Sequence, residues 1–169
     1  MTLTVRALGL ALLVFAAVAT PVAQPRPDAA KIKQQLIGSY KLVSYVQYDQ
    51  NGVERRTNHT AGQISYDAAG RMSAQLMPGD RPPLPAGGQA TDAQRAAAAA
   101  GYIAYFGRYE IDAEKGVVYH HVEGSLSQNM LGQAMPRYFE FSPDGQTLYL
   151  TTKNGDRVTG RLRWDRYKE

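Results

Sequence analysis

Tight-turn signals at hairpin spacing restrict the fold of this chain more than any other feature. Each of the five clearest signals contains a glycine. They lie at 51–52, 68–70, 114–116, 143–145 and 154–156. Asn51-Gly52 is a strong hairpin signal, because this dipeptide favours the two-residue turn between antiparallel strands. Between the turns, apolar and polar residues alternate with the period of two that is typical of β-strands. The chain is therefore expected to form consecutive antiparallel hairpins.

Eight segments are predicted as strands, and a weaker ninth strand is expected near 53–57. The eight lie at 39–49, 61–67, 71–77, 102–112, 117–123, 135–142, 146–152 and 157–165. A sheet of this size, with few helices to cover it, protects its edge strands best by closing on itself. We therefore predict an all-β fold, a single antiparallel up-and-down β-barrel of eight to nine strands over 38–169. A β-sandwich is the alternative, and the consecutive hairpins favour the barrel.

A short helix is expected in the N-terminal linker, 24–37. Asp28 can cap its first turn, and Gly38 ends it. Ile32 and Leu36 lie on one side of this helix, as the helical period requires. After Gly38 the pattern changes from helical to alternating, which marks the start of the barrel.

A second short helix is expected in an insertion between the strands at 71–77 and 102–112. Prolines and glycines at 78–90 exclude regular structure in the first half of the insertion. Thr91 and Gln94 then have the spacing of a capping box, which marks the start of a helix. An insertion of this kind usually lies over one opening of a barrel.

The segment 1–23 has the composition of a secretory signal peptide. Arg6 is followed by an apolar run over 7–19, which is shorter than the about 20 residues of a membrane span. Cleavage is expected after Ala19 or Ala23, and an uncleaved N-terminal anchor is the alternative. We expect a secreted or periplasmic protein with no stable membrane span after cleavage. About 145 residues then remain, enough for one domain with a sizeable core.

The composition and the motifs exclude several classes of function. The chain has no cysteine, which excludes disulfides, thiolate catalysis and cysteine metal ligands. Its basic residues are scattered and its net charge is +4, so no nucleic-acid partner is expected. A nucleophile motif, a phosphate loop and a dinucleotide fingerprint are all missing, so no cofactor is expected. His120 and His121 point to opposite faces of one strand, and His59 lies in a distant loop, so no metal site is expected. The sequence leaves the oligomeric state open.

Several segments together resemble the bacterial and fungal lipocalin-like domain family, a group of calycin-type β-barrels distinct from the secreted animal lipocalins. These segments are 38–45, 62–74, 105–110, 120–125, 137–139 and 162–164. The resemblance covers nearly everything from Gly38 to the end, and it implies the barrel fold. Such barrels usually place a tryptophan two residues after the first-strand glycine, where it plugs the closed end against an arginine of the C-terminal strand. Tyr40 holds that position in this chain.

The strands at 102–112 and 117–123 carry the most informative polar residues. If Tyr105 faces the barrel interior, Tyr109 does too, because side chains alternate between the two faces of a strand. On the next strand either His120 or His121 faces inward, and parity alone leaves both open. We favour His121, because Glu123 then shares the interior face as a possible orienting partner.

An arginine is predicted to supply the charge of the interior. Arg137 lies in a strand with Phe139 on the same side, and a buried arginine needs an anion, a carboxylate or a ring face. Glu123 is a candidate for that partner, and Tyr66 and Gln75 can add polar groups. The candidate ligand-binding residues are Tyr66, Gln75, Tyr105, Tyr109, His121, Glu123, Arg137 and Phe139.

These residues favour a binding protein that holds a small, largely hydrophobic molecule inside the barrel. A carboxylate or other polar end of that molecule would meet Arg137. One alternative is a cofactor-free isomerase or cyclase that acts on a hydrophobic substrate in the same cavity through His121, Arg137 and tyrosines. Another is a structural or interaction protein whose barrel is filled by Tyr and Phe side chains.

Overall fold

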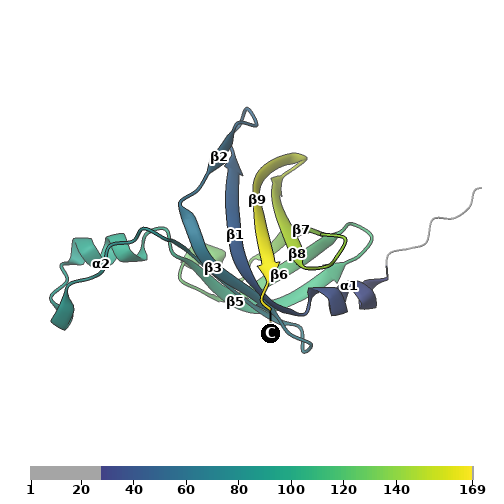
Figure 1. The fold of residues 1–169 in the computed structure, drawn as a ribbon, viewed down its shortest axis with the longest axis horizontal. Helices are drawn as coiled ribbons and strands as arrows, with labels where there is room; N and C mark the ends of the chain where they lie inside the picture. The colour runs from purple at the N-terminus through teal and green to yellow at the C-terminus, as the bar shows by residue number, and fades with distance from the viewer. Residues whose placement is uncertain (1–27, 169) are drawn as a thin grey trace, which may run out of the picture.

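Eight antiparallel strands close into a barrel, and a ninth strand extends from its rim (Figure 1). The computed structural model describes residues 28–168, so the expected signal peptide at 1–23 lies outside the described residues. The strand order is β2-β1-β3-β4-β5-β6-β7-β8-β9, and an additional pairing between β1 and β9 closes the ring. The predicted up-and-down barrel is therefore confirmed.

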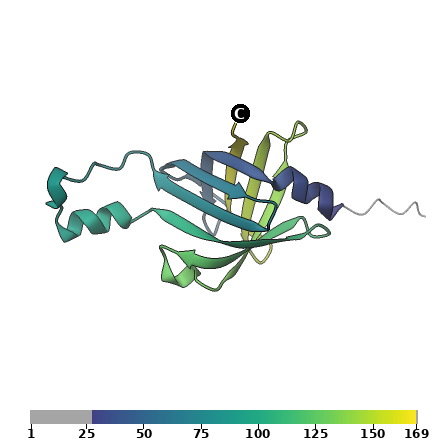
Figure 2. The same cartoon turned by 90° about the horizontal axis from the view of Figure 1, so that it is seen from below.

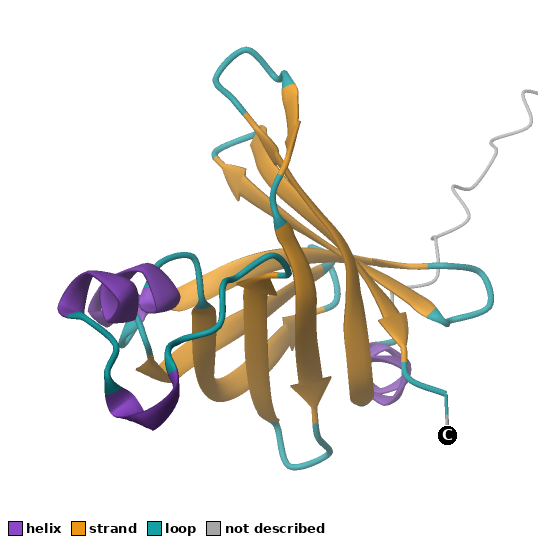
Figure 3. Ribbon diagram, turned by 60° about the vertical axis from the view of Figure 1, so that its left-hand side comes forward, coloured by secondary structure: helices purple, strands orange, loops and turns teal. Residues whose placement is uncertain are grey.

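The strands follow the predicted hairpins closely. They are β1 (Gly38–Tyr48), β2 (Glu54–Arg56), β3 (His59–Tyr66), β4 (Arg71–Pro78), β5 (Ile103–Asp112), β6 (Val117–Ser125), β7 (Ala134–Phe141), β8 (Thr147–Asn154) and β9 (Arg157–Arg166). The helical elements are α1 (Ala29–Leu36), η1 (Ala86–Gly88), α2 (Asp92–Ala99) and η2 (Gln128–Met130). The strands form the body of the molecule and the helices lie at its periphery (Figure 3). None of the helices in the described chain is long and apolar enough to cross a membrane.

The barrel closes because β1 is long enough to pair with three other strands. Its first half pairs with β3, as in Tyr40↔Ile64, and its end pairs with β2. Along its other edge β1 pairs with β9, where Leu42 lies opposite Trp164. A pairing between the first and last barrel strands leaves no open edge along the ring, which separates this fold from a sandwich.

Helix α1 lies at one end of the barrel and helps to close it. The Asp28 side chain accepts hydrogen bonds from the backbone N–H groups of Ala30 (3.0 Å) and Lys31 (3.3 Å), so the predicted cap is confirmed. Leu36, in the last turn, is fully buried in the core. We call this end of the barrel, where β1 begins, the closed end.

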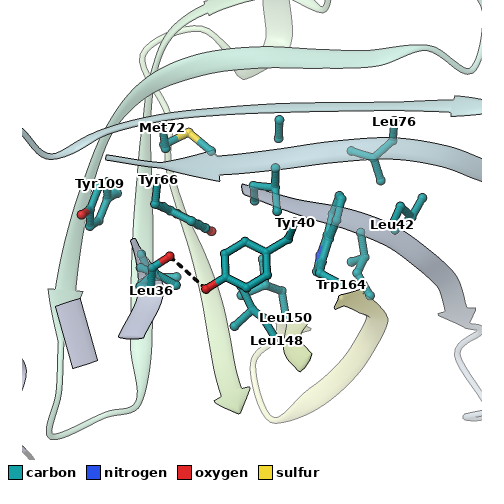
Figure 4. Packing of buried hydrophobic residues seen from close by; sticks show 14 of the residues in the cluster. Leu36, Tyr40, Leu42, Tyr66, Met72, Leu76, Tyr109, Leu148, Leu150 and Trp164 are labelled. Atoms are coloured by element: carbon teal, nitrogen blue, oxygen red, sulfur yellow. Dashed lines mark hydrogen bonds between the residues drawn. The ribbon is translucent and has the colours of Figure 1, made fainter. Parts of the chain in front are cut away.

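Tyr40 plugs the closed end, as the resemblance implied. Its side chain is fully buried between Leu36 and Trp164 (Figure 4). The Tyr40 hydroxyl lies 2.9 Å from the carbonyl oxygen of Gln35 and 3.1 Å from that of Leu36. The Arg166 guanidinium, on the C-terminal strand, lies 4.6 Å from the Tyr40 ring centroid and donates to the hydroxyl at 2.5 Å. Burial raises the pKa of Tyr40 to about 12, against the opposing effect of the Arg166 charge.

The inserted helix α2 forms as predicted, but it does not cover the barrel. Its capping box is present, because Thr91 Oγ1 accepts from the Gln94 backbone N–H at 3.2 Å and Gln94 Oε1 accepts from the Thr91 N–H at 2.9 Å. No residue of α2 is buried, and the helix projects away from the strands in two views (Figures 1 and 2). The expectation that it lies over an opening was wrong, since this alanine-rich helix offers no large apolar side chain to cover one.

Candidate functional site

A cavity of about 170 Å³ lies in the barrel interior, toward the end opposite α1. Tyr45 lies late in β1 and Ile103 begins β5, so both line the cavity near the end from which the insertion leaves the barrel. Met130 reaches it from η2. The lining residues are Tyr45, Ile64, Leu76, Ile103, Tyr105, Met130, Arg137, Leu150, Thr152, Leu162 and Trp164. Most of them are apolar, and none carries a carboxylate.

Arg137 is the charged residue of the lining, and it has no acidic partner within the described residues. Its Nη1 donates to the Pro136 carbonyl oxygen at 2.9 Å, and its Nη2 lies 3.5 Å from Met135 Sδ. None of the ion pairs within residues 28–168 includes Arg137. Because Arg137 lies opposite buried Val118 in the sheet, its side chain belongs to the interior face. The cavity therefore holds a positive charge that these residues leave uncompensated.

The Trp164 indole adds an unpaired hydrogen-bond donor to the cavity wall. Its side chain is 1% exposed and lines the cavity. Nε1 has no hydrogen-bond partner in the described part of the chain. Buried polar groups are nearly always hydrogen-bonded, so an unpaired N–H in a cavity wall marks a position where an acceptor is lacking.

A buried histidine lies directly behind the cavity, held between two tyrosines. His120 is fully buried, with Nε2 2.7 Å from the Tyr66 hydroxyl and Nδ1 3.0 Å from the Tyr105 hydroxyl. Burial holds the pKa of His120 well below its usual range, and electrostatic interactions with Arg137 and His121 act in the same direction. Burial likewise raises the pKa of Tyr66 and of Tyr105. All three side chains are therefore neutral near pH 7.

The structure corrects the predicted orientation of β6, because His120 faces inward and His121 faces outward. Opposed residues share a face, and Tyr109 lies opposite His120. His121 Nε2 instead lies 3.2 Å from Glu110 Oε2 on the outer surface. The apolar residues on the same face of β6 as His120 could have predicted that this face turns inward. Val118 and Val122 alternate with His120, whereas the face with His121 also carries Tyr119 and Glu123.

Glu123 also faces outward, so it cannot compensate Arg137. Its carboxylate accepts two hydrogen bonds from Arg71, at 2.7 and 3.1 Å, and one from Arg108 Nε at 3.0 Å. These bonds, led by those from Arg71, lower the pKa of Glu123. The predicted pairing of Glu123 with Arg137 was wrong, because the two residues lie on opposite faces of the sheet.

The other predicted residues divide between the two faces. Gln75 alternates with buried Ala74 and Leu76 and therefore faces outward, contrary to prediction. Tyr109 faces inward as expected, and its hydroxyl donates to the Asp67 carbonyl oxygen at 2.7 Å.

Phe139 faces the interior and packs with Phe141, their ring centroids 5.9 Å apart. Of the eight candidates, Tyr105 and Arg137 line the cavity itself. The remaining lining residues were missed because they come from six strands and a short helix, and no local motif marks them.

His59 does not join the other histidines. Its Nε2 lies 2.7 Å from the Gly101 carbonyl oxygen. Across the described chain no group of three or more His, Asp or Glu side chains is arranged to hold a metal ion.

Comparisons with known proteins give one family match. No curated protein matches the chain. Among solved structures, a redesigned beta barrel is similar to it, with 10% identity and a TM-score of 0.38 over 80% of this chain and 95% of that one. The model of the lipocalin-like domain matches residues 37–167, from the residue before β1 to the end of the barrel. The chain therefore belongs to the lipocalin-like domain family.

Proposed function

We propose that this barrel is an exported protein that binds a small, largely hydrophobic molecule, with a carboxylate of that molecule held by Arg137. The observation that carries the proposal is the uncompensated guanidinium in an otherwise apolar cavity. Arg137 is half-buried, and a charge that is partly withdrawn from water is stabilised by a paired anion. A ligand carboxylate would supply the missing partner and could accept two parallel N–H bonds from arginine.

The volume of the cavity limits the size of the ligand. The cavity measures about 170 Å³, and an engineered apolar cavity of about 150 Å³ is known to hold benzene. A ligand with one ring, or with a short alkyl chain, fits this space. Ile64, Leu76 and Leu150 would contact its apolar part.

The geometry gives less support to the enzymatic alternative. That alternative required His121 in the cavity, and His121 lies outside the barrel beside Glu110. His120 is inside, but it does not line the cavity and is already bonded through both ring nitrogens. A binding role needs neither histidine as a base.

The proposal is tested by titrating the protein with benzoate and following ligand and protein signals by NMR. We expect saturable binding to the wild type and a loss of about 10- to 100-fold in affinity for Arg137→Gln, because a charged hydrogen-bond pair is removed. Arg161→Gln is the matched control, since Arg161 pairs with Glu140 on the outer surface and should leave affinity unchanged.

Two results would contradict the proposal. One is the absence of saturable binding of any single-ring or short-chain carboxylate to the wild type. The other is equal affinity in the two arginine variants. Export is tested separately by N-terminal sequencing of the protein from a secreting host. A mature chain that starts at Thr20 or Gln24 supports it, and an intact Met1 in the cell interior contradicts it.

A further inference from the structure

The three side chains Tyr66, His120 and Tyr105 form a continuous hydrogen-bonded row that ends at the cavity. Tyr66 is the end of the row that does not line the cavity, and Tyr105 is the end that does. The direction of the hydrogen bonds in this row decides what Tyr105 offers to a ligand. That direction follows from the number of protons that the neutral His120 ring carries.

A neutral imidazole carries one N–H and one bare nitrogen. His120 therefore donates to one tyrosine and accepts from the other. In the first arrangement Tyr66 donates to Nε2, and Nδ1–H donates to the Tyr105 oxygen. In the second arrangement Tyr105 donates to Nδ1, and Nε2–H donates to the Tyr66 oxygen.

The surroundings of Tyr66 select the first arrangement. Within residues 28–168, His120 Nε2 is the one hydrogen-bond partner of the Tyr66 hydroxyl, and the Tyr66 side chain is 2% exposed. In the second arrangement the Tyr66 O–H would be buried without an acceptor, which is costly. In the first arrangement, the O–H that makes no hydrogen bond within the row belongs to Tyr105. Tyr105 lies in the cavity wall, where a bound molecule can accept a hydrogen bond from it.

Tyr105 and Arg137 both line the cavity. Burial raises the pKa of Tyr105, and the charge of Arg137 and a hydrogen bond from its side chain oppose that shift. In the first arrangement the phenol oxygen accepts from Arg137 and from His120 Nδ1–H, and its own O–H is left to donate into the cavity.

We propose that Tyr66 and His120 are positioning residues that hold the Tyr105 hydroxyl as a hydrogen-bond donor into the cavity. The ligand's polar end is then an anionic acceptor, met by Arg137 and by Tyr105. Together with the size of the cavity, this defines the ligand class as monocarboxylates with one ring or a short chain. Benzoate should bind far better than benzyl alcohol, and benzylamine should be repelled.

This inference rests on the proposed function for the identity of the ligand. Its central claim concerns the tautomer of His120, which can be measured without any ligand. The ¹⁵N shifts of labelled histidine distinguish the two neutral tautomers, and His59→Gln and His121→Gln variants assign the three rings. We expect His120 to carry its proton on Nδ1, with Nε2 bare. A proton on Nε2 would overturn the inference, even if benzoate binds.

The binding test compares two buried tyrosines, one whose hydroxyl is hydrogen-bonded to His120 and one whose hydroxyl is not. Tyr66→Phe removes the donor to His120, whereas Tyr109→Phe removes a hydroxyl that donates to the Asp67 carbonyl and does not touch His120. We expect Tyr105→Phe to weaken benzoate binding about 10-fold or more, because it removes the donor itself. Tyr66→Phe should weaken benzoate about 3- to 10-fold without changing the cavity lining, and Tyr109→Phe should leave the affinity unchanged.

The outcomes separate the two proposals. Equal effects of Tyr66→Phe and Tyr109→Phe would overturn the positioning role, while benzoate binding by the wild type would still support the proposed function. Benzyl alcohol binding as tightly as benzoate would overturn the anionic class. If none of the three compounds binds, the proposed function and the ligand class both fail, and the tautomer of His120 is still decided by its ¹⁵N shifts. Thermal unfolding of each variant checks that the barrel is intact.

Discussion

The contact between Arg166 and Tyr40 should be a main source of stability at the closed end. Arg166 Nη1 donates to the Ile37 carbonyl oxygen at 2.8 Å, and Nη2 lies 2.6 Å from the Gln35 carbonyl oxygen and 2.5 Å from the Tyr40 hydroxyl. Arg166→Met keeps much of the aliphatic stem and removes all of these bonds. The two carbonyl groups and the phenol then lose a charged donor in a half-buried site.

The size of the effect follows from the number of bonds lost. A hydrogen bond to a charged group contributes about 1.5–3 kcal/mol, and the partial exposure of Arg166 favours the lower end of that range. The bonds to Ile37 and Tyr40 are partly buried and count at that value, whereas the bond to Gln35 is exposed and adds little. We therefore expect Arg166→Met to lower the free energy of unfolding by about 3 kcal/mol. Tyr40→Phe, which loses one hydroxyl and its bonds, should lower it by about 2 kcal/mol.

A double-mutant cycle measured by urea unfolding provides the assay. The two residues share the bond between Arg166 Nη2 and the Tyr40 hydroxyl, so the double variant should lose about 1 kcal/mol less than the sum of the single losses. Arg161→Met is the control, because its exposed bridge to Glu140 should be worth less than about 1 kcal/mol. Equal losses for Arg166→Met and Arg161→Met, or strict additivity in the cycle, would refute the reasoning.

Two further predictions concern β5 and β6. The pKa of His120 is depressed by burial, so its stabilising contribution is present above pH 6.5 and is lost as the pH falls below that value, when the unfolded state takes up the proton. Urea unfolding between pH 6.5 and 5 should show a steeper loss of stability in the wild type than in His120→Gln, and equal slopes would count against this assignment. Gly107→Ala should destabilise the barrel by about 2–3 kcal/mol, because its Cβ would lie 1.9 Å from the backbone oxygen of His121. Gly124→Ala should cost less in the same measurement, because its Cβ meets only the Phe106 ring, which is 53% exposed and can move aside; a larger loss there would contradict the argument.

Much of the fold could be predicted because its signals are local. A turn such as Asn51-Gly52 and an alternating strand are read from a few neighbouring residues. The caps at Asp28 and Thr91 are equally local, and the structure contains both. The position of α2 is not local, since it depends on which surfaces the helix can bury.

The site was harder to predict, because it depends on which face of each strand turns inward. For β5, the aromatic residues Tyr105 and Tyr109 gave the correct face. For β6, the possible pairing of His121 with Glu123 outweighed the apolar flanks of His120, and this choice was wrong. Burial of Val118 and Val122 stabilises the barrel, whereas His121 and Glu123 gain more by staying in water.

The cavity itself could not be read from any one segment. Its wall combines residues from seven strands and η2, and the volume left between them depends on how every side chain packs. Arg137 was found because a charge next to phenylalanines on one strand face is unusual. Trp164 was named in the resemblance, but its unpaired N–H emerges only from the structure.

The closure of the barrel by Arg166 also sets the order of events during synthesis. Gln35 and Arg166 are separated by 131 positions in the chain, and β9 is the last of the described strands to leave the ribosome. The first strand can find its β9 neighbour only after the strands between them have been made, and contacts between such distant residues form slowly. The barrel therefore stays open, with one edge of β1 unpaired, until β9 has been made.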